Sequence, residues 1–130
     1  MDDYDFVRGV IWDSLPELRR TLMEIEAEQA EFDEDEEDLS TVSIYSLASD
    51  VFIDGALAPL LSSEEIEKGV AIRCADVIET LLLRGSAEVR QMVSIRITDY
   101  LLGWNLWEKF SQHSGPALLE EVGRRRRYYF

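Results

Sequence analysis

The sequence has very few of the side chains that most catalytic and metal sites use. It contains one cysteine, Cys74, and one histidine, His113, among 130 residues. A lone cysteine cannot form an intramolecular disulfide, and these two residues cannot complete a tetrahedral zinc site. The sequence therefore excludes a fold held by internal disulfides and predicts no metal site. It is compatible with a reducing compartment, and we expect a cytoplasmic protein.

Neither residue has neighbours in the sequence that would make it reactive. His113 lies in a polar turn before Gly115 and Pro116, and Cys74 is spaced like a buried residue between Val70 and Val77. The seven glycines form no phosphate-binding loop, nucleophile elbow or dinucleotide fingerprint. We expect no catalytic residues and no cofactor. The remaining enzymatic alternative is a metal-dependent carboxylate enzyme, which would need two inward-facing carboxylates around a pocket.

Basic residues are scarce relative to acidic ones. The chain has 27 acidic and 13 basic side chains, a net charge of -14, and the first 40 residues alone carry a net charge of -12. Such a charge repels nucleic acid and anionic membranes and attracts basic partners. The acidic N-terminus and the lack of a run of about 18 apolar residues predict neither export nor membrane insertion. We therefore expect a basic protein partner, no nucleic acid and no membrane, with a homo-oligomer left open.

The apolar residues, 46% of the chain, are sufficient for one domain over residues 1–130 and recur at helical spacing. The pattern predicts an all-α compact bundle of about six helices. We expect a short helix over 3–12, a second beginning with a capping box at Ser14, a third over about 42–54 with a kinked extension around Gly55 and Pro59, and a short last helix near 118–122.

Two further helices are expected to form a central antiparallel hairpin. Glu64–Arg84 follows a capping box at Ser62 and ends at Gly85, where a left-handed C-terminal cap is expected. Ser86 then caps the helix Ala87–Leu102. The core of the hairpin is predicted to contain Val77, Leu81, Val93 and Ile97.

Two charged segments interrupt the helical pattern. A block of like charges is expected to form an acidic loop at about 33–39. This loop is either a solvated linker or an acidic surface that is complementary to a basic protein. It contains Asp33, Glu34, Asp35, Glu36, Glu37 and Asp38. Residues 124–130 combine four arginines with three aromatic residues and are expected to form a tail, or to pair with the acidic N-terminal half.

Trp104 and Trp107 are three residues apart and are expected to share one helix face. They are either core residues or an exposed anchor for a partner, because buried aromatic side chains dominate both settings. Together with the acidic block, they complete the set of candidate partner-binding residues.

The stretch Gly85–Gly103 resembles the first helix of a HEAT-type repeat. It has an acidic residue, then Val-Arg and then a run of apolar residues at the spacing of that repeat. From Ile44 to about Gly115 the chain resembles small helical immunity proteins encoded in bacterial polymorphic toxin loci. The residues that carry this resemblance are Ile66, Ile78, Glu79, Leu81, Leu82, Gly85, Glu88, Val89, Gly115 and Pro116. The resemblance implies binding of a toxin without catalysis.

The sequence thus predicts a non-enzymatic protein-binding module. Its expected role is that of an immunity protein, which neutralises a cognate bacterial toxin by masking the toxin's active site or substrate surface. The alternative is an acidic helical adaptor or scaffold subunit in a multi-protein assembly.

Overall fold

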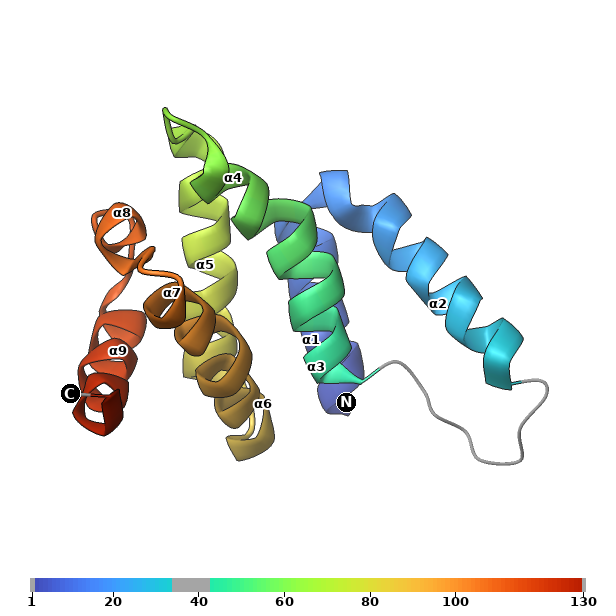
Figure 1. Ribbon diagram of the computed structural model, residues 1–130. Coiled ribbons are helices and arrows are strands. Elements are labelled where there is room, and N and C mark those ends of the chain that lie inside the picture. The colour runs from blue at the N-terminus through green and yellow to red at the C-terminus, as the bar shows by residue number, and fades with distance from the viewer. Residues whose placement is uncertain (1, 34–42, 130) are drawn as a thin grey trace.

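The computed structural model describes residues 2–33 and 43–129, with the side chains of residues 30–33, 128 and 129 left out. In this part of the chain every regular element is helical, which confirms the all-α prediction (Figure 1). Several elements follow one another without a break, so that they form seven continuous helices within the described ranges. Their elements are α1 (Asp3–Ser14), η1 (Pro16–Leu18), α2 (Arg19–Asp33), α3 (Ile44–Ser46), η2 (Leu47–Leu57), α4 (Ala58–Ser62), α5 (Lys68–Arg84), α6 (Ala87–Met92), η3 (Val93–Thr98), α7 (Asp99–Gly103), α8 (Trp107–Ser111) and α9 (Pro116–Tyr129).

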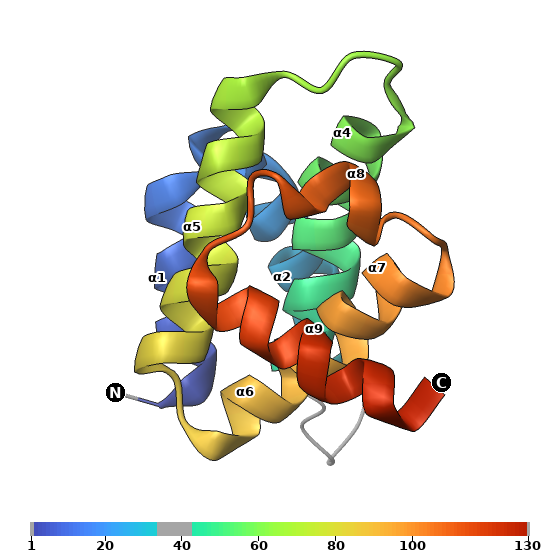
Figure 2. The ribbon, with the colours of Figure 1, turned by 90° about the vertical axis from the view of Figure 1, so that its left-hand side faces the viewer.

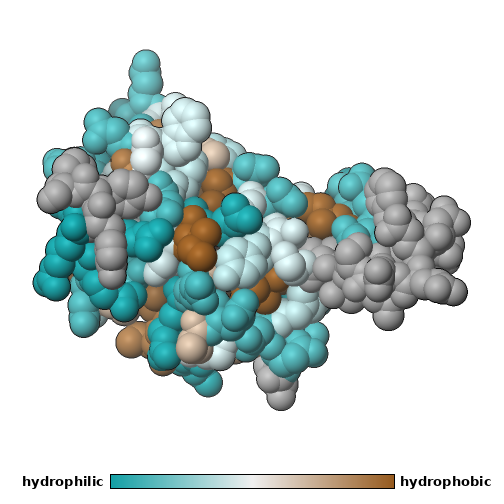
Figure 3. Space-filling view, turned by 60° about the horizontal axis from the view of Figure 1, so that its bottom comes forward, coloured by the Kyte–Doolittle hydropathy of each residue, from teal (hydrophilic) through white to brown (hydrophobic). Residues whose placement is uncertain are grey.

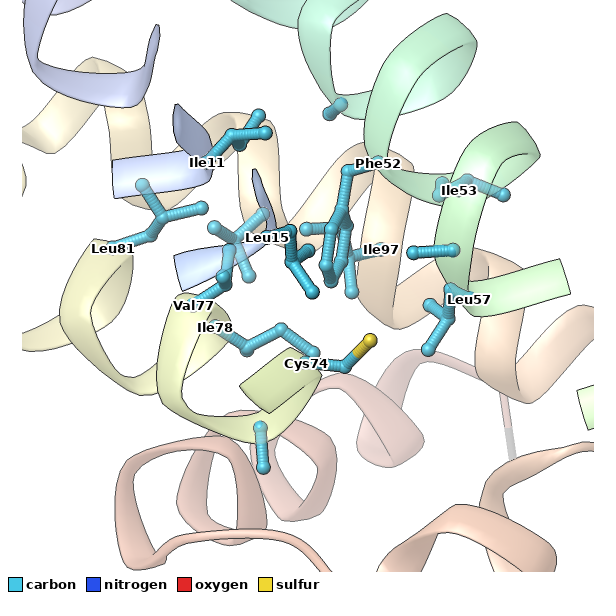
Figure 4. Packing of buried hydrophobic residues seen from close by; sticks show 14 of the residues in the cluster. Ile11, Leu15, Phe52, Ile53, Leu57, Cys74, Val77, Ile78, Leu81 and Ile97 are labelled. Carbon is cyan, nitrogen blue, oxygen red and sulfur yellow. The ribbon is translucent and has the colours of Figure 1, made fainter. Parts of the chain in front are cut away.

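Helix α5 occupies the centre of the bundle. It packs against α1 and η2 on one side and against α9 on the other, and it continues through a short turn into α6 (Figures 1 and 2). Ile11 of α1, Leu15 directly after α1 and Phe52 of η2 point into one interior, together with Val77 and Leu81 of α5 (Figure 4). Because each helix contributes one apolar stripe to this interior, a single core cluster joins α1 to α9.

The predicted central hairpin is confirmed. Val77, Val93 and Ile97 are fully buried and Leu81 is 1% exposed. Ser86 caps α6 as expected, since its Oγ accepts a hydrogen bond from the Val89 N–H at 3.2 Å. The hairpin therefore follows from local signals that the sequence contains.

The turn at Gly85 has a different cause from the one expected. Gly85 has φ −77° and ψ 160°, so it is extended rather than left-handed. A Cβ at this position would lie 2.3 Å from the Leu81 carbonyl oxygen and 2.6 Å from Val89 Cγ1. Glycine is required here because the two helices approach closely, and not because the backbone takes a positive φ.

The two other predicted capping boxes are wrong. Ser14 is the last residue of α1, and α5 begins at Lys68, with Glu67 before it making no side-chain cap. Ser62 ends the preceding helix instead, and its hydroxyl donates to the Ala58 carbonyl oxygen at 2.7 Å. A serine next to acidic residues fits either end of a helix, because its hydroxyl can donate to a carbonyl as well as accept from an N–H.

The third helix extends beyond its predicted end and runs from Ile44 to Ser62, with η2 wound as a π-helix. Pro59 lies in the first turn of α4, next to the point where the hydrogen-bond pattern changes, so its missing N–H does not end the helix. By length and composition alone this helix could cross a membrane. Here it is a core helix, with Leu47, Val51 and Leu57 fully buried.

Candidate partner-binding site

The expected acidic site falls mostly outside the described residues. Asp33 is the last residue of α2, and Glu34, Asp35, Glu36, Glu37 and Asp38 follow it in the part that the structure leaves out. Helix α2 fixes where that segment begins. It diverges from the bundle toward its C-terminal end, at the edge of the molecule that lies farthest from α8 and α9 (Figure 1).

Contacts with α1 hold α2 in this position. Glu26 accepts hydrogen bonds from the Tyr4 hydroxyl and from Arg8, whose Nε lies 2.9 Å from Oε2. Burial alone would raise the pKa of Glu26, but the hydrogen bonds from Arg8 and Tyr4 outweigh it and keep the pKa below its ordinary value. The guanidinium groups of Arg8 and Arg19 also lie 4.8 and 5.0 Å from the ring centroid of Trp12. These charged and aromatic contacts therefore fix α2, the helix from which the acidic segment continues.

Trp104 and Trp107 do not share a helix face. Helix α7 ends at Gly103, and Asn105 takes a left-handed conformation with φ 57°. The Leu106 N–H then bonds the Leu101 carbonyl at 2.8 Å and the Asn105 N–H bonds the Leu102 carbonyl at 3.2 Å, which is the Schellman pattern. This cap leaves Trp104 73% exposed and places Trp107 in the core at 7%. Only Trp104 is accessible to a partner.

A groove that the sequence did not indicate lies where η1, α4 and the start of α5 meet. It has a volume of about 290 Å³. Ala56 and Leu60 are buried and Val70 is half-buried, and these residues form an apolar floor. Three exposed carboxylates, those of Glu17, Glu65 and Glu67, surround that floor. We call this feature the acidic groove.

The carboxylates of the acidic groove differ in their availability. Glu17 forms an ion pair with Arg73, whose Nη1 lies 2.8 Å from Oε2. The carboxylates of Glu65 and Glu67 make no hydrogen bond or ion pair within the described part of the chain. A lysine or arginine of a partner could lay its aliphatic stem on the floor and bring its charge to these two carboxylates. The pattern of Ser62–Glu67 predicts a helix start, so the sequence does not indicate Glu65 and Glu67 as candidate binding residues.

Within the described residues, Arg124 and Arg125 pair with acidic side chains of the C-terminal half of the chain. Helix α9 continues to Tyr129, so the expected basic-aromatic tail at 124–130 is helical up to that residue. Arg125 donates to both oxygens of Asp99, at 2.8 and 2.9 Å, and Arg124 pairs with Glu121. Arg125 and Asp99 are close because α9 packs on η3, and Asp99 begins α7 directly after η3. Arg124 and Glu121 are close because they lie three residues apart on α9.

The two residues first considered for catalysis lie apart from this groove. Cys74 is fully buried, and burial raises the pKa of its thiol to about 12. His113 is half-buried beside Phe110, with the ring centroids 6.5 Å apart. Among the side chains that the structure describes, those of residues 2–29 and 43–127, no three His, Cys, Asp or Glu are grouped so that they could hold a metal ion.

No protein-family model, no curated protein and no solved structure matches this chain.

Proposed function

We propose that this protein is a non-enzymatic binding module for a basic protein and that it acts as an immunity protein, masking the active site or substrate surface of a bacterial toxin domain. The observation that carries the proposal is the acidic groove. Its floor is apolar, and two of its carboxylates, Glu65 and Glu67, have no partner in the described residues. Such a groove suits the insertion of a basic side chain from another protein.

The charge of the whole chain supports the same proposal. The net charge of -14 comes mainly from the first 70 residues, which also contain Glu17, Glu65 and Glu67. A surface of one sign speeds the encounter with a partner of the opposite sign and disfavours other partners. An inhibitor that must capture a toxin before it acts benefits from both effects. The resemblance of the stretch from Ile44 to about Gly115 to small helical immunity proteins of toxin loci gives the proposal its specific form.

A growth experiment tests the inhibitor role. The C-terminal domain of the protein encoded immediately upstream of this gene is expressed with and without this chain. We expect growth arrest without the chain and normal growth with it. An upstream product that is not toxic, or a toxic one that this chain does not counteract, would contradict the immunity role.

Paired charge reversals test the groove itself. Glu65→Lys with Glu67→Lys should weaken binding of the toxin domain by about tenfold or more, because like charges then face the partner across the groove. Asp76→Lys with Glu108→Lys changes the net charge equally at exposed positions that do not line the groove. This control should bind within about threefold of the wild type, since distant exposed charges are screened. Equal losses in both pairs would leave no special role for the groove.

The exposed Trp104 favours a second candidate, an acidic adaptor that joins two proteins. Trp104 is 73% exposed in the turn between α7 and α8, and it does not line the acidic groove. An adaptor should bind one protein through the acidic groove and a second through Trp104. Trp104→Ala would then abolish one interaction and preserve the other, whereas an inhibitor with one partner would not show this separation.

A further inference from the structure

A second groove lies where the helix formed by α6 and η3 packs beside α9. It has a volume of about 460 Å³, within the range of small-molecule sites. Its lining includes Arg90, Arg124, Arg125, Ser94 and Glu121. We call it the arginine groove. It lies near the C-terminal end of α5, whereas the acidic groove lies near the N-terminal end of the same helix (Figure 1).

Its charge is opposite to that of the chain. Three guanidinium groups and one carboxylate, that of Glu121, line the groove, and Asp99, which does not line it, pairs with Arg125. One positive charge is therefore in excess, in a protein whose net charge is -14. Arg90 is exposed, and its guanidinium makes no hydrogen bond or ion pair with the described residues. A cluster of like charges persists at a cost from mutual repulsion, and binding of an anion would relieve that cost.

The single carboxylate does not cancel the positive charge that the groove presents. Glu121 is 6% exposed and Ser94 is 8% exposed, so both belong to the floor. One oxygen of Glu121 accepts from the Ser94 hydroxyl and the other accepts from Arg124. Both oxygens of Glu121 are therefore already hydrogen-bonded. The bond to Ser94 fixes the carboxylate, and the carboxylate in turn fixes the guanidinium of Arg124 at the groove.

Arg125 is held in the same way from the other side. It bonds both oxygens of Asp99, and its side chain is 29% exposed. Two of the three guanidinium groups are therefore fixed before any ligand arrives, which reduces the entropy lost on binding. Next to them, Ile95 is 38% exposed and gives the groove one apolar wall.

We infer that the arginine groove binds a small organic phosphate. A phosphate monoester carries a charge near −2 at neutral pH and several strong acceptor oxygens, which match guanidinium forks. A phosphate group can accept from several guanidinium groups at once, whereas a carboxylate has only two acceptor oxygens. The volume exceeds that of a phosphate alone, so the organic part of the ligand lies against Ile95. This inference does not depend on the proposed toxin partner.

Titration calorimetry with phenyl phosphate and with pyrophosphate at low salt tests the site. We expect saturable binding of both, and amide shifts of Gln91 and Ser94 in nuclear magnetic resonance spectra. Arg90→Gln should weaken binding by about tenfold, the loss typical of one charge-assisted contact. It should leave folding intact, because Arg90 has no partner to lose among the described residues.

Arg127→Gln is the matched control, since it removes the same charge from an exposed position of α9 that does not line the groove. It should bind within about twofold of the wild type. Three results would overturn the inference: no saturation by either probe, equal losses in Arg90→Gln and Arg127→Gln, or binding of succinate as tight as that of phenyl phosphate. Arg124→Gln adds a further check, and a folded variant that binds as well as the wild type would also overturn it.

Discussion

Leu81 shows how a single side chain joins the helices of this protein. It is 1% exposed on α5, on the side that faces α1 (Figure 4). Two residues later, Leu83 is 68% exposed on the same helix. The two leucines have the same chemistry and nearly the same position in the chain, so the difference between them isolates the contribution of burial.

Leu81→Ala should lower the free energy of unfolding by about 2–5 kcal/mol, because lost transfer energy and a residual cavity add. Leu83→Ala should change it by less than about 0.5 kcal/mol, as exposed substitutions usually do. Urea denaturation of both variants measures the difference. Equal effects would show that Leu81 is not in the core.

Cys74 gives a chemical probe of the same interior. Burial raises the pKa of its thiol to about 12, and only the thiolate is an effective nucleophile. The native protein should therefore react with a thiol reagent at pH 8 at least about a hundredfold more slowly than the protein in denaturant. Labelling followed by absorbance checks this, and rapid labelling under native conditions would contradict the packing of α5.

At the scale of elements, the attachment of α2 to α1 depends on ionised Glu26. Its pKa is lower in the folded protein than its ordinary value of 4.5. The ionised form therefore stabilises the folded protein at pH values above 4.5, and this stabilisation is lost as the pH falls through the lower, folded-state pKa. Acid should loosen α2 before it affects the helices around α5.

Comparison of the wild type with Glu26→Gln isolates this contribution from the other 26 acidic side chains. The difference in unfolding free energy between them should be greatest near neutral pH and should shrink below about pH 4.5. Thermal unfolding at several pH values measures it. A difference that stays constant from pH 7 to pH 3 would argue against an ionised Glu26 in the tether.

Helix α9 is fixed by an acidic side chain from another helix. Glu79 of α5 accepts the N–H groups of Ala117 at 2.7 Å and Leu118 at 3.1 Å. A carboxylate satisfies free N–H groups at a helix N-terminus and also interacts favourably with the helix dipole. The glycine before Pro116 makes room for it, since a Cβ on Gly115 would lie 2.4 Å from the Glu79 carboxylate carbon.

Gly115→Ala should therefore destabilise the protein by about 1–3 kcal/mol, by displacing the half-buried carboxylate of Glu79 from its two donors. In a Glu79→Ala background the same change should cost much less, because the contact that it disturbs is already gone. A double-mutant cycle by denaturation measures this coupling. Additive effects would mean that Gly115 acts independently of Glu79.

At the scale of the whole molecule, charge is distributed unevenly. The first 40 residues carry a net charge of -12, whereas residues 71–130 carry +2. The face shown in Figure 3 is largely hydrophilic, and its hydrophobic residues form small separate patches. Recognition by such a surface depends more on charge and on single anchors than on a broad apolar area.

If the proposed toxin domain is the partner, reversal of Glu34, Glu36 and Glu37 to lysine should slow association with it and reduce the dependence of that rate on salt. The dissociation rate and the fold should change little, because like charges that are adjacent in the sequence repel one another and contribute little to stability. Stopped-flow association of both proteins across a salt series measures this. Identical rates and salt slopes would make the acidic block a solvated linker. Trp104→Ala, if Trp104 contacts the same toxin, should instead raise the dissociation rate and cost about 2 kcal/mol.

The sequence by itself determined the helices and the central hairpin. The burial of Val77, Leu81, Val93 and Ile97 and the cap at Ser86 depend on residues within one or two turns, so periodicity and local hydrogen bonding were enough to predict them. The opposite fates of Trp104 and Trp107 also have a local cause, the left-handed Asn105. Asparagine is a less frequent residue than glycine at this cap position. The apolar residues up to Trp104 continue the helical spacing, so the sequence pattern did not predict that the helix ends there.

Only the tertiary structure decided where the candidate sites lie. The ion pair of Glu17 with Arg73 joins residues 56 positions apart, and the bond from Ser94 to Glu121 spans 27. The acidic groove and the arginine groove are each built from segments distant in the chain. Helical periodicity gives the face on which a residue lies, but not which other helix that face meets. Packing of whole helices around α5 determines those pairings, and therefore which charged side chains meet across a groove.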